Sequence, residues 1–252
     1  MKSWMPAALA AALCLTTPAL AQTDTDYIAA VEKPGRPDEA RTLDASRKPA
    51  LILSFLGLKQ GMTAADVMAG TGYYSEIMSR LVGPNGKVIA YEPTQFYEGE
   101  KPKAMWDALI ARTSGVSLQT YPFDGFAAPA NSLDFTLLHL VYHDLYWQSE
   151  KYKVPQTDPA AFLKTLYAAT RPGGIVGVID HVGPEGDTRA TVEKLHRIDP
   201  AVVKADFAAA GFVLEAESDA LHIAADDHSK MVFDPAIRGK TDRVVYRFRK
   251  PK

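Results

Sequence analysis

Apolar and polar residues follow the periods of strands and helices in turn along this chain. Short, almost continuous apolar runs predict strands at residues 64–69, 87–91, 116–121, 132–140, 175–180, 212–217 and 243–249. Segments with apolar residues three or four positions apart predict helices between several of these strands. Such alternation is typical of a doubly wound sheet. We therefore predict an α/β fold with a mostly parallel, seven-stranded sheet.

Proline, glycine and aspartate mark the predicted helix ends. The segment 83–86, Gly-Pro-Asn-Gly, ends an amphipathic helix that begins near Tyr74. Asp158 and Asp199 each precede a proline, a pattern typical of helix starts because aspartate caps the helix and proline fits its first turn. The last two strands are joined by a long excursion, residues 221–242, without helical periodicity. Two closing strands of this kind resemble an antiparallel C-terminal hairpin.

Residues 1–21 differ from the rest of the chain. Lys2 precedes an apolar block at 7–15, and Ala19-Leu20-Ala21 follows. A basic start, a short apolar region and an A-x-A site predict a signal peptide, and therefore an exported, periplasmic protein that begins at Gln22. Cys14 permits a lipoprotein as an alternative, but the leucine before it is larger than the residue usual at that place. The apolar block is too short to span a bilayer, which takes about 20 residues.

Length and charge narrow the class of protein. A chain of 252 residues with a formal charge of −2 suits one large domain. We divide the remainder into an N-terminal arm and capping helices, 22–61, and a main domain, 62–252. No basic tract favours nucleic acid, and we expect no membrane contact after signal cleavage. The only cysteine lies in the signal peptide, so the mature protein has no disulfide and no thiol nucleophile.

The segment from Met62 to Glu92 combines the features expected of a nucleoside site. A strand, the tight turn 70–72, a helix and a second strand follow one another, and Glu92 ends the second strand. A glycine turn lets backbone N–H groups at a helix N-terminus approach a ligand, and a carboxylate there can accept both ribose hydroxyls. Ser75 stands where a dinucleotide fingerprint has its third glycine. The pattern therefore also permits a plain βαβ unit.

The run Asp66-Val-Met-Ala-Gly-Thr-Gly72 resembles the acidic, glycine-rich motif of class I S-adenosylmethionine-dependent methyltransferases. The resemblance implies a Rossmann-like methyltransferase fold with S-adenosyl-L-methionine as the cofactor. It places the acid and the turn against the methionine part of the cofactor and the acid after the second strand against its ribose. Met68 replaces the first glycine of the motif and narrows the room beside the cofactor. The cofactor-binding positions that the resemblance implies here are Asp66, Ala69, Gly70, Gly72, Tyr73 and Glu92.

Candidate chemistry follows two neighbouring strands, at the carboxyl ends where parallel sheets bind ligands. We predict catalytic roles for His143, His181 and Asp180, with His143 as the base, because imidazole has an ordinary pKa of about 6.5. We predict cofactor contacts from His139 and from Asp124, which follows the third strand and could meet the adenine amino group. The side chains predicted to wall a small-molecule substrate pocket are Tyr142, Tyr146 and Trp147.

Each of these assignments has a structural alternative. His139 is explained equally well as a core histidine, Asp124 as the start of a turn, and the aromatic residues as a lid packed on the core. The histidines at the strand ends could also ligate a metal together with Asp144 or Asp180. Their spacing matches no metal signature, and we assign no metal site.

Three runs in the C-terminal half are similar to a group of exported bacterial methyltransferases whose acceptor is unsettled. They are residues 171–181, 196–199 and 224–242. The third run carries several charged residues that could close over the active site, and its alternative is a solvated connector with weak salt bridges. These residues are Asp226, Asp227, His228, Lys230, Arg238 and Lys240.

The leading hypothesis is a methyltransferase that acts on a small molecule outside the cytoplasm, although its cofactor is made in the cytoplasm. The second is a non-catalytic nucleoside- or ligand-binding protein on the same fold, which Met68 favours. A nicotinamide-dependent oxidoreductase is disfavoured by Ser75 and by the closing hairpin. The sequence does not decide the oligomeric state.

Overall fold

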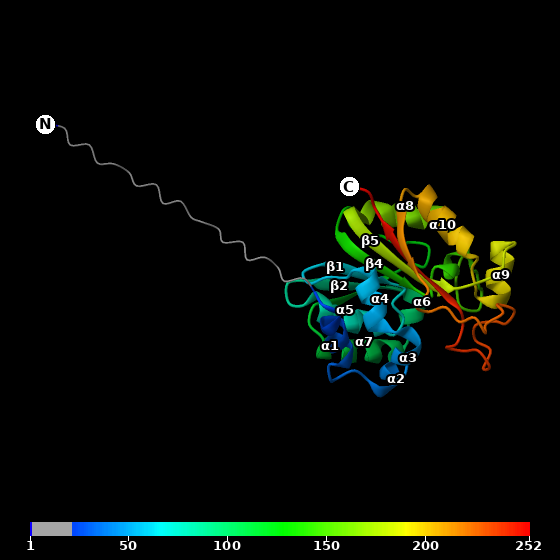
Figure 1. The fold of residues 1–252 in the computed structure, drawn as a ribbon, viewed down its shortest axis with the longest axis horizontal. Helices are drawn as coiled ribbons and strands as arrows, with labels where there is room; N and C mark the ends of the chain where they lie inside the picture. The colour runs from blue at the N-terminus through cyan, green and yellow to red at the C-terminus, as the bar shows by residue number, and fades with distance from the viewer. Residues whose placement is uncertain (2–21) are drawn as a thin grey trace.

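A seven-stranded sheet forms the centre of the computed structural model, which describes Met1 and residues 22–252 (Figure 1). The strand order is β3-β2-β1-β4-β5-β7-β6, and β7 runs antiparallel to both of its neighbours. The strands are β1 (Thr63–Val67), β2 (Lys87–Pro93), β3 (Val116–Tyr121), β4 (Leu133–His139), β5 (Thr170–His181), β6 (Val213–Ser218) and β7 (Arg243–Arg249). The predicted fold, a mostly parallel sheet with an antiparallel C-terminal hairpin, is confirmed.

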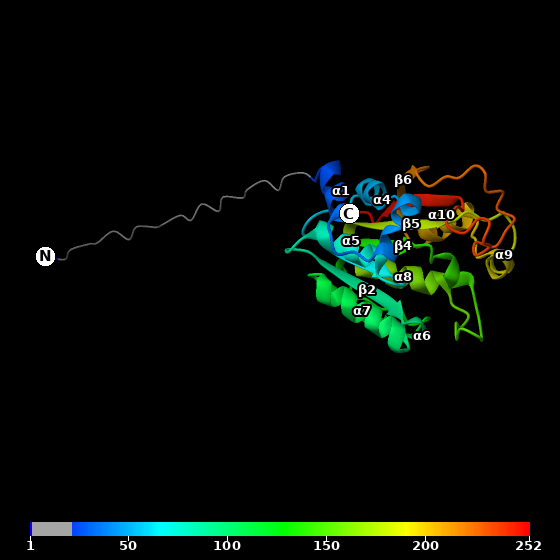
Figure 2. The ribbon, with the colours of Figure 1, turned by 90° about the horizontal axis from the view of Figure 1, so that it is seen from below.

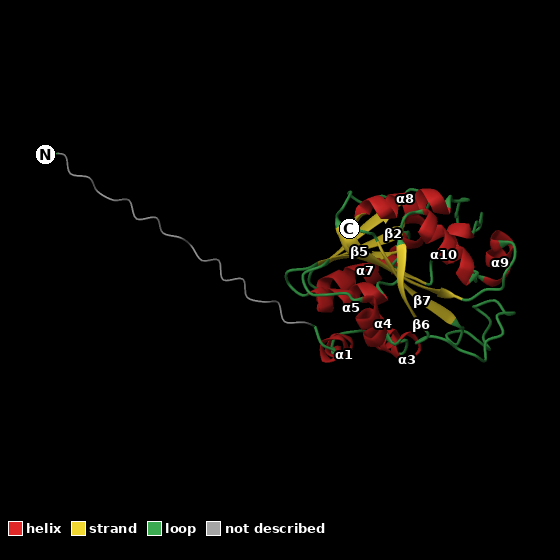
Figure 3. Ribbon diagram, turned by 45° about the horizontal axis from the view of Figure 1, so that its top comes forward, coloured by secondary structure: helices red, strands yellow, loops and turns green. Residues whose placement is uncertain are grey.

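Helices cover both faces of this sheet (Figures 2 and 3). Those before β4 are α1 (Asp24–Glu32), α2 (Asp38–Arg41), α3 (Asp44–Arg47), α4 (Pro49–Leu56), α5 (Tyr73–Val82), α6 (Thr94–Tyr97) and α7 (Glu100–Arg112). Those after β4 are α8 (Pro159–Ala169), α9 (Thr188–Leu195) and α10 (Pro200–Ala209). One apolar cluster joins α1, α4 and α5 to the sheet, and another joins α8 and α10 to its opposite face. The core therefore has two layers, one on each side of the sheet.

The central strands are buried on both faces, as their apolar sequences predict. All five residues of β1 are buried, and β4 is buried along most of its length. Parallel strands between two helical layers read as continuous apolar runs for this reason. From β1 to β3 the chain adds strands toward one edge of the sheet, and from β4 onward it adds them toward the other edge. The switch lies between β1 and β4, which are paired neighbours. In such sheets the crevice beyond the carboxyl ends at this switch point is the ordinary place for a ligand.

Two helices differ from the sequence-based expectation. The segment predicted as an N-terminal arm, at the start of residues 22–61, contains α1, which begins with a capping box between Thr23 and Asp26. Only Tyr27 and Ala30 of this helix are buried, so its apolar stripe is too narrow to give a clear period. Helix α9 was not predicted at all. It begins at the N-cap Asp187, whose side chain accepts a hydrogen bond from the N–H of Ala190.

The predicted signal peptide, residues 1–21, lies almost wholly outside the described residues, which resume at Gln22. Within the described part of the chain, no helix has the length and apolar character needed to cross a bilayer.

Candidate active site

The glycine turn lies between β1 and α5 and is tied to the end of β2. The N–H of Gly70 donates a hydrogen bond of 2.7 Å to the Glu92 carboxylate. Gly72 has a φ of +74°, and a Cβ added there would overlap Leu109 and Trp106 of α7. The indole N–H of Trp106 also donates to the Gly70 carbonyl, at 3.1 Å. The turn therefore requires glycine and is held from two sides.

Met68 adopts a left-handed conformation, with a φ of +54°. Residues with a Cβ pay a steric cost in this region, which glycine occupies freely. The backbone therefore explains why the methyltransferase motif has glycine at this place. Here the methionine side chain is 9% exposed and lines the cavity beside the turn.

A cavity of about 530 Å³ opens at the carboxyl ends of β1 and β2, and we call it the glycine-turn cavity. Its lining residues are Met68, Gly70, Thr71, Glu92, Phe96, Lys101, Pro102, Met105, Trp106, Val141 and Asp144. These lining residues suit a nucleoside, because a carboxylate that can accept hydrogen bonds from hydroxyl groups lies among apolar and aromatic surfaces. Burial raises the pKa of Glu92 to about 8. The site is thus shaped for a ligand that donates hydrogen bonds to this carboxylate.

The other residues predicted at this site divide into two groups. Asp66 is buried directly below the turn, accepts a hydrogen bond of 2.6 Å from Ser75, and has its pKa raised by burial to about 7. Tyr73 turns its hydroxyl to Asp44 instead, at 2.6 Å. Ala69 joins the turn to the end of β2 through a backbone hydrogen bond to Tyr91. None of these three residues lines the glycine-turn cavity.

Asp124 and His139 lie elsewhere. Asp124 lines another cavity, of about 1180 Å³, that contains neither the glycine turn nor His143. The His139 ring packs against Tyr74, with centroids 4.7 Å apart, and its Nε2 has no hydrogen-bond partner among the described residues. Burial lowers the pKa of His139 well below its ordinary value. The structure therefore favours the core interpretation of His139 and does not bring Asp124 to Glu92.

His143 follows β4 and is enclosed between two aspartates. Its Nδ1 lies 2.7 Å from Asp180 at the end of β5, and its Nε2 lies 3.3 Å from Asp144. The backbone N–H of His143 also donates to Asp180, at 2.8 Å. Burial opposes a charge on this ring, but the two carboxylates outweigh it and raise the pKa of His143 to about 9. The residue is an imidazolium at neutral pH.

This geometry bears on the predicted role of His143. A general base must accept a proton, but Nδ1 here is bound to Asp180 and the two carboxylates favour the protonated ring. The pKa of Asp180 lies below its ordinary value, because the charge and hydrogen bonds of His143 lower it by more than burial raises it. Asp180 and His143 therefore form a buried ion pair. His181 is no better as a base, because burial lowers its pKa to about 3 and Thr241 binds its Nδ1 at 2.8 Å.

A second cavity of about 580 Å³ lies beside His143, and we call it the histidine cavity. It is lined by Phe96, Leu140, His143, Asp144, Trp147, Ser149, Tyr152, His181, Glu193, His196, Met231, Val232 and Phe233. Trp147 thus lies where a substrate wall was predicted. Tyr146 lines the cavity of about 1180 Å³ instead, and the ring of Tyr142 is buried in the core. Both hydroxyls donate to Asp206.

His196 is a site residue to which the sequence pattern gave no role, whereas the segment 231–233 lies within the run 224–242 that was expected to close over the active site. His196 ends α9 with a φ of +50°, and its ring contacts those of Trp147 and Phe233, with centroids 4.9 and 5.2 Å apart. The only sequence signal for His196 was its place in the run 196–199. The helix that positions it was itself missed.

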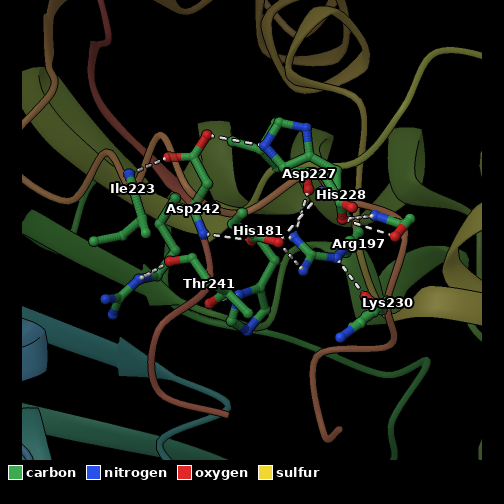
Figure 4. A network of polar contacts seen from close by, with 12 residues as sticks. His181, Arg197, Ile223, Asp227, His228, Lys230, Thr241 and Asp242 are labelled. Atoms are coloured by element: carbon green, nitrogen blue, oxygen red, sulfur yellow. Dashed lines mark hydrogen bonds and ion pairs between the residues drawn. The ribbon is translucent and has the colours of Figure 1, made fainter. Parts of the chain in front are cut away.

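Most residues of the excursion 221–242 are exposed, but polar contacts to a few buried side chains fix its backbone (Figure 4). Arg197 is fully buried and forms two hydrogen bonds with Asp226, at 2.9 and 3.0 Å. The same guanidinium donates to the Lys230 carbonyl. Asp242 binds the rings of His222 and His228, at 2.9 and 3.0 Å. These contacts hold the backbone that carries one wall of the histidine cavity.

Among residues 22–252, no group of three or more histidine, cysteine, aspartate or glutamate side chains is placed to hold a metal ion.

Part of this chain is similar to known methyltransferases. Residues 25–99 match the family model of protein-L-isoaspartate(D-aspartate) O-methyltransferase. The protein-L-isoaspartate O-methyltransferase of Methanothrix thermoacetophila is 36% identical over 52 residues, which make up 21% of this chain and 25% of that protein. The match thus spans only about a quarter of that relative's length.

Solved structures extend the likeness over most of the chain. A SAM-dependent methyltransferase from Aquifex aeolicus has a TM-score of 0.58 and 22% identity, and the match covers 85% of this chain and 98% of that one. The chain has the class I methyltransferase fold. The cyclase SpnF shares it, with a TM-score of 0.57, 18% identity and coverage of 87% and 85%. The fold alone therefore does not fix the reaction, whereas the family match at the glycine turn supports a methyltransferase with S-adenosylmethionine as its cofactor.

Proposed function

We propose that this protein is an S-adenosylmethionine-dependent methyltransferase that acts on a small-molecule acceptor outside the cytoplasm. One observation carries the proposal: the glycine-turn cavity, with Glu92 bound to the Gly70 N–H, adjoins a second cavity of similar size. Methyl transfer needs two ligands in contact. Two adjoining cavities at the switch point of the sheet provide places for both.

The residues of the glycine-turn cavity fit the cofactor by their chemistry. Glu92 would accept the ribose hydroxyls, and Phe96 and Trp106 offer flat apolar surfaces to a base. Asp66, fixed by Ser75, would support the turn from below. S-adenosylmethionine supplies a methyl group bonded to a positively charged sulfur when it is bound. The protein's own contribution is to orient that group toward the second cavity and to exclude water.

A small-molecule acceptor is favoured over a protein by the histidine cavity. Its volume, about 580 Å³, lies within the range of about 300–1,000 Å³ typical of small-ligand sites. The family model of protein-L-isoaspartate(D-aspartate) O-methyltransferase matches this chain at residues 25–99, which include Phe96 but no other residue of the histidine cavity. The match therefore bears on the cofactor and not on the acceptor.

Calorimetric titration of the purified protein with S-adenosylmethionine, S-adenosylhomocysteine and NAD tests the cofactor. We expect binding of the first two and none of NAD. Binding of NAD alone would contradict the proposal and favour an oxidoreductase. If none of the three ligands bound, the assignment of a nucleoside site to the glycine-turn cavity would be wrong.

A binding protein without catalysis is the second candidate, and Met68 favours it because its side chain occupies part of the cavity that glycine would leave open. Incubation with methyl-labelled S-adenosylmethionine and a set of small acceptors separates the two. Cofactor binding with label retained on the cofactor across the whole set would favour the binding protein.

The proposed location outside the cytoplasm rests on residues 1–21 and on the similarity to exported bacterial methyltransferases. N-terminal sequencing of the protein recovered from the periplasm of a bacterial host tests it. We expect the sequence to begin at Gln22. A different start, a lipid on Cys14 or retention in the cytoplasm would contradict this part of the proposal.

A further inference from the structure

The two cavities meet at Asp144. Phe96 and Asp144 are the two residues that line both, so they form the boundary between the sites proposed for cofactor and acceptor. The Asp144 side chain is 21% exposed, whereas that of His143 is 4% exposed and that of Asp180 is fully buried. Of the three linked ionisable groups, Asp144 is therefore the most accessible to a ligand.

Asp144 is held as an acceptor by the groups behind it. His143 bridges it to Asp180, and the bridging ring is an imidazolium that favours the ionised form of both carboxylates. Burial raises the pKa of Asp144 to about 6, against the effect of His143. A group of this kind is largely ionised at neutral pH and is basic enough to take a proton in a transition state.

The rest of the histidine cavity selects against an anionic ligand. Among the described residues that line it, none is lysine or arginine, and Glu193 adds a second carboxylate. The charge of His143 is already shared by two aspartates, and burial keeps His181 and His196 neutral by lowering their pKa values to about 3 and about 4. A carboxylate ligand would therefore meet Asp144 and Glu193 without a free cation.

The remaining surface of the cavity is largely aromatic and apolar. Trp147, Tyr152 and Phe233 contribute rings, and Tyr152 and Phe233 are about half exposed, so they form the rim. Flat apolar walls suit a ring by offset or edge-to-face stacking. The combination of such walls with a single deep carboxylate fits a neutral ring that carries a hydroxyl group.

We propose that Asp144 is the catalytic residue that accepts the proton of a phenolic substrate bound in the histidine cavity. This rests on the proposed methyltransferase function. The phenol oxygen forms a bond to the methyl carbon, and its O–H proton passes to Asp144. The bond between that carbon and the cofactor sulfur breaks, and its electron pair stays on the sulfur. His143 and Asp180 take no proton in this step and are positioning residues.

The first test needs no cofactor. para-Nitrophenol and para-nitrobenzoate are flat rings of similar size, and their binding can be followed by absorbance and calorimetry. Because Asp144 is negative, the pKa of bound para-nitrophenol should rise by about one unit or more, and para-nitrobenzoate should bind at least about tenfold more weakly than the phenol at neutral pH. Asp144→Asn should abolish the pKa rise and narrow the difference between the two probes. Glu98→Gln, a change of the same kind at an exposed position, should alter neither.

The second test measures turnover with a phenolic acceptor found by screening. Asp144→Asn should lower kcat by about 10²–10⁴ and leave the affinity for S-adenosylmethionine unchanged. Asp144→Glu should retain part of the rate and shift the acidic limb of the pH profile. Thermal melting of each variant shows whether it is folded, and the probe measurements are made on the same samples.

The outcomes separate this inference from the function on which it rests. If the probes behave as expected but S-adenosylmethionine does not bind, the cavity is assigned correctly and the methyltransferase proposal fails. If S-adenosylmethionine binds but para-nitrophenol does not, or para-nitrobenzoate binds as tightly, the phenolic acceptor is overturned. Unchanged turnover in folded Asp144→Asn would overturn the role of this carboxylate.

Discussion

Replacement of Glu92 by glutamine should stabilise the protein while it weakens cofactor binding. Glu92 is 3% exposed, and burial raises its pKa from 4.5 to about 8. Each unit of this difference corresponds to about 1.36 kcal/mol, so ionisation of Glu92 costs the folded state about 4–5 kcal/mol. Glutamine keeps the shape and an oxygen that can accept from the Gly70 N–H, but it carries no charge to bury.

The sign of the effect follows from the direction of the shift. A carboxyl group with a raised folded pKa gives no penalty below pH 4.5, where both states hold the proton. The wild-type protein loses stability as pH rises from there through about 8, because the unfolded state ionises more readily. The free-energy difference between Glu92→Gln and wild type should therefore be near zero at pH 4.5 and reach several kcal/mol above pH 8.

Urea unfolding of both proteins across this pH range measures the difference. Glu98→Gln is the matched control, because the Glu98 side chain is 60% exposed and its loss should leave the pH dependence unchanged. Parallel curves for wild type and Glu92→Gln would refute the reasoning, since they would show that Glu92 ionises in the folded protein at little cost.

The same variant tests the cofactor site. Hydrogen bonds to a charged group contribute about 1.5–3 kcal/mol each, so loss of the charge should weaken S-adenosylmethionine binding by about tenfold to a hundredfold. Ribose hydroxyls would favour the ionised carboxylate, so wild-type affinity should rise with pH toward 8 and that of Glu92→Gln should not. Equal affinity of the two proteins for S-adenosylmethionine would show that Glu92 does not bind the ribose.

Three further predictions concern other parts of the molecule. Arg197→Ala leaves Asp226 buried without its partner and should lower the free energy of unfolding by about 3–5 kcal/mol, as measured by urea unfolding. As a control, removal of Lys204 from its exposed pair with Glu217 should lower it by about 1 kcal/mol or less. Met68→Gly should tighten S-adenosylmethionine binding by calorimetry, because it relieves a left-handed residue and widens the cavity; weaker binding would show that the methionine contacts the cofactor. His143 has a folded pKa of about 9, so its ion pair stabilises the protein fully below pH 6.5 and is lost as pH rises through 9; the stability of His143→Gln should lack this decline, and an identical pH profile would contradict the ion pair.

The sequence predicted those parts of the site that are encoded within one contiguous segment. The glycine turn and Glu92 belong to a single strand–turn–helix–strand unit, whose order fixes their positions relative to each other. His143 and Asp180 were also placed correctly at neighbouring strand ends, because adjacent parallel strands end at the same edge of a sheet. The predicted seven-stranded fold followed from the same apolar pattern.

The environment of individual side chains could not be predicted in this way. Whether the ring of His143 is free or enclosed depends on rotamers and on contacts between β4, β5 and the loop that follows. Tyr142 and Tyr146 turn away to Asp206 because α10, far along the chain, offers a carboxylate there. His196 reaches the histidine cavity only because α9 ends in a left-handed residue, and neither feature has a strong local signal.

The fixed excursion has a consequence for the timescale of ligand exchange. The backbone N–H of Val232 donates to the Leu195 carbonyl, and Arg197 holds the Lys230 carbonyl from inside the fold. A loop anchored in this way opens only by breaking buried contacts, so its amides should exchange with solvent far more slowly than those of an ordinary surface loop. A ligand would then enter past the exposed rim side chains, which reorient in nanoseconds or less. The wall itself would be in place before the ligand arrives, and little conformational entropy would be lost on binding.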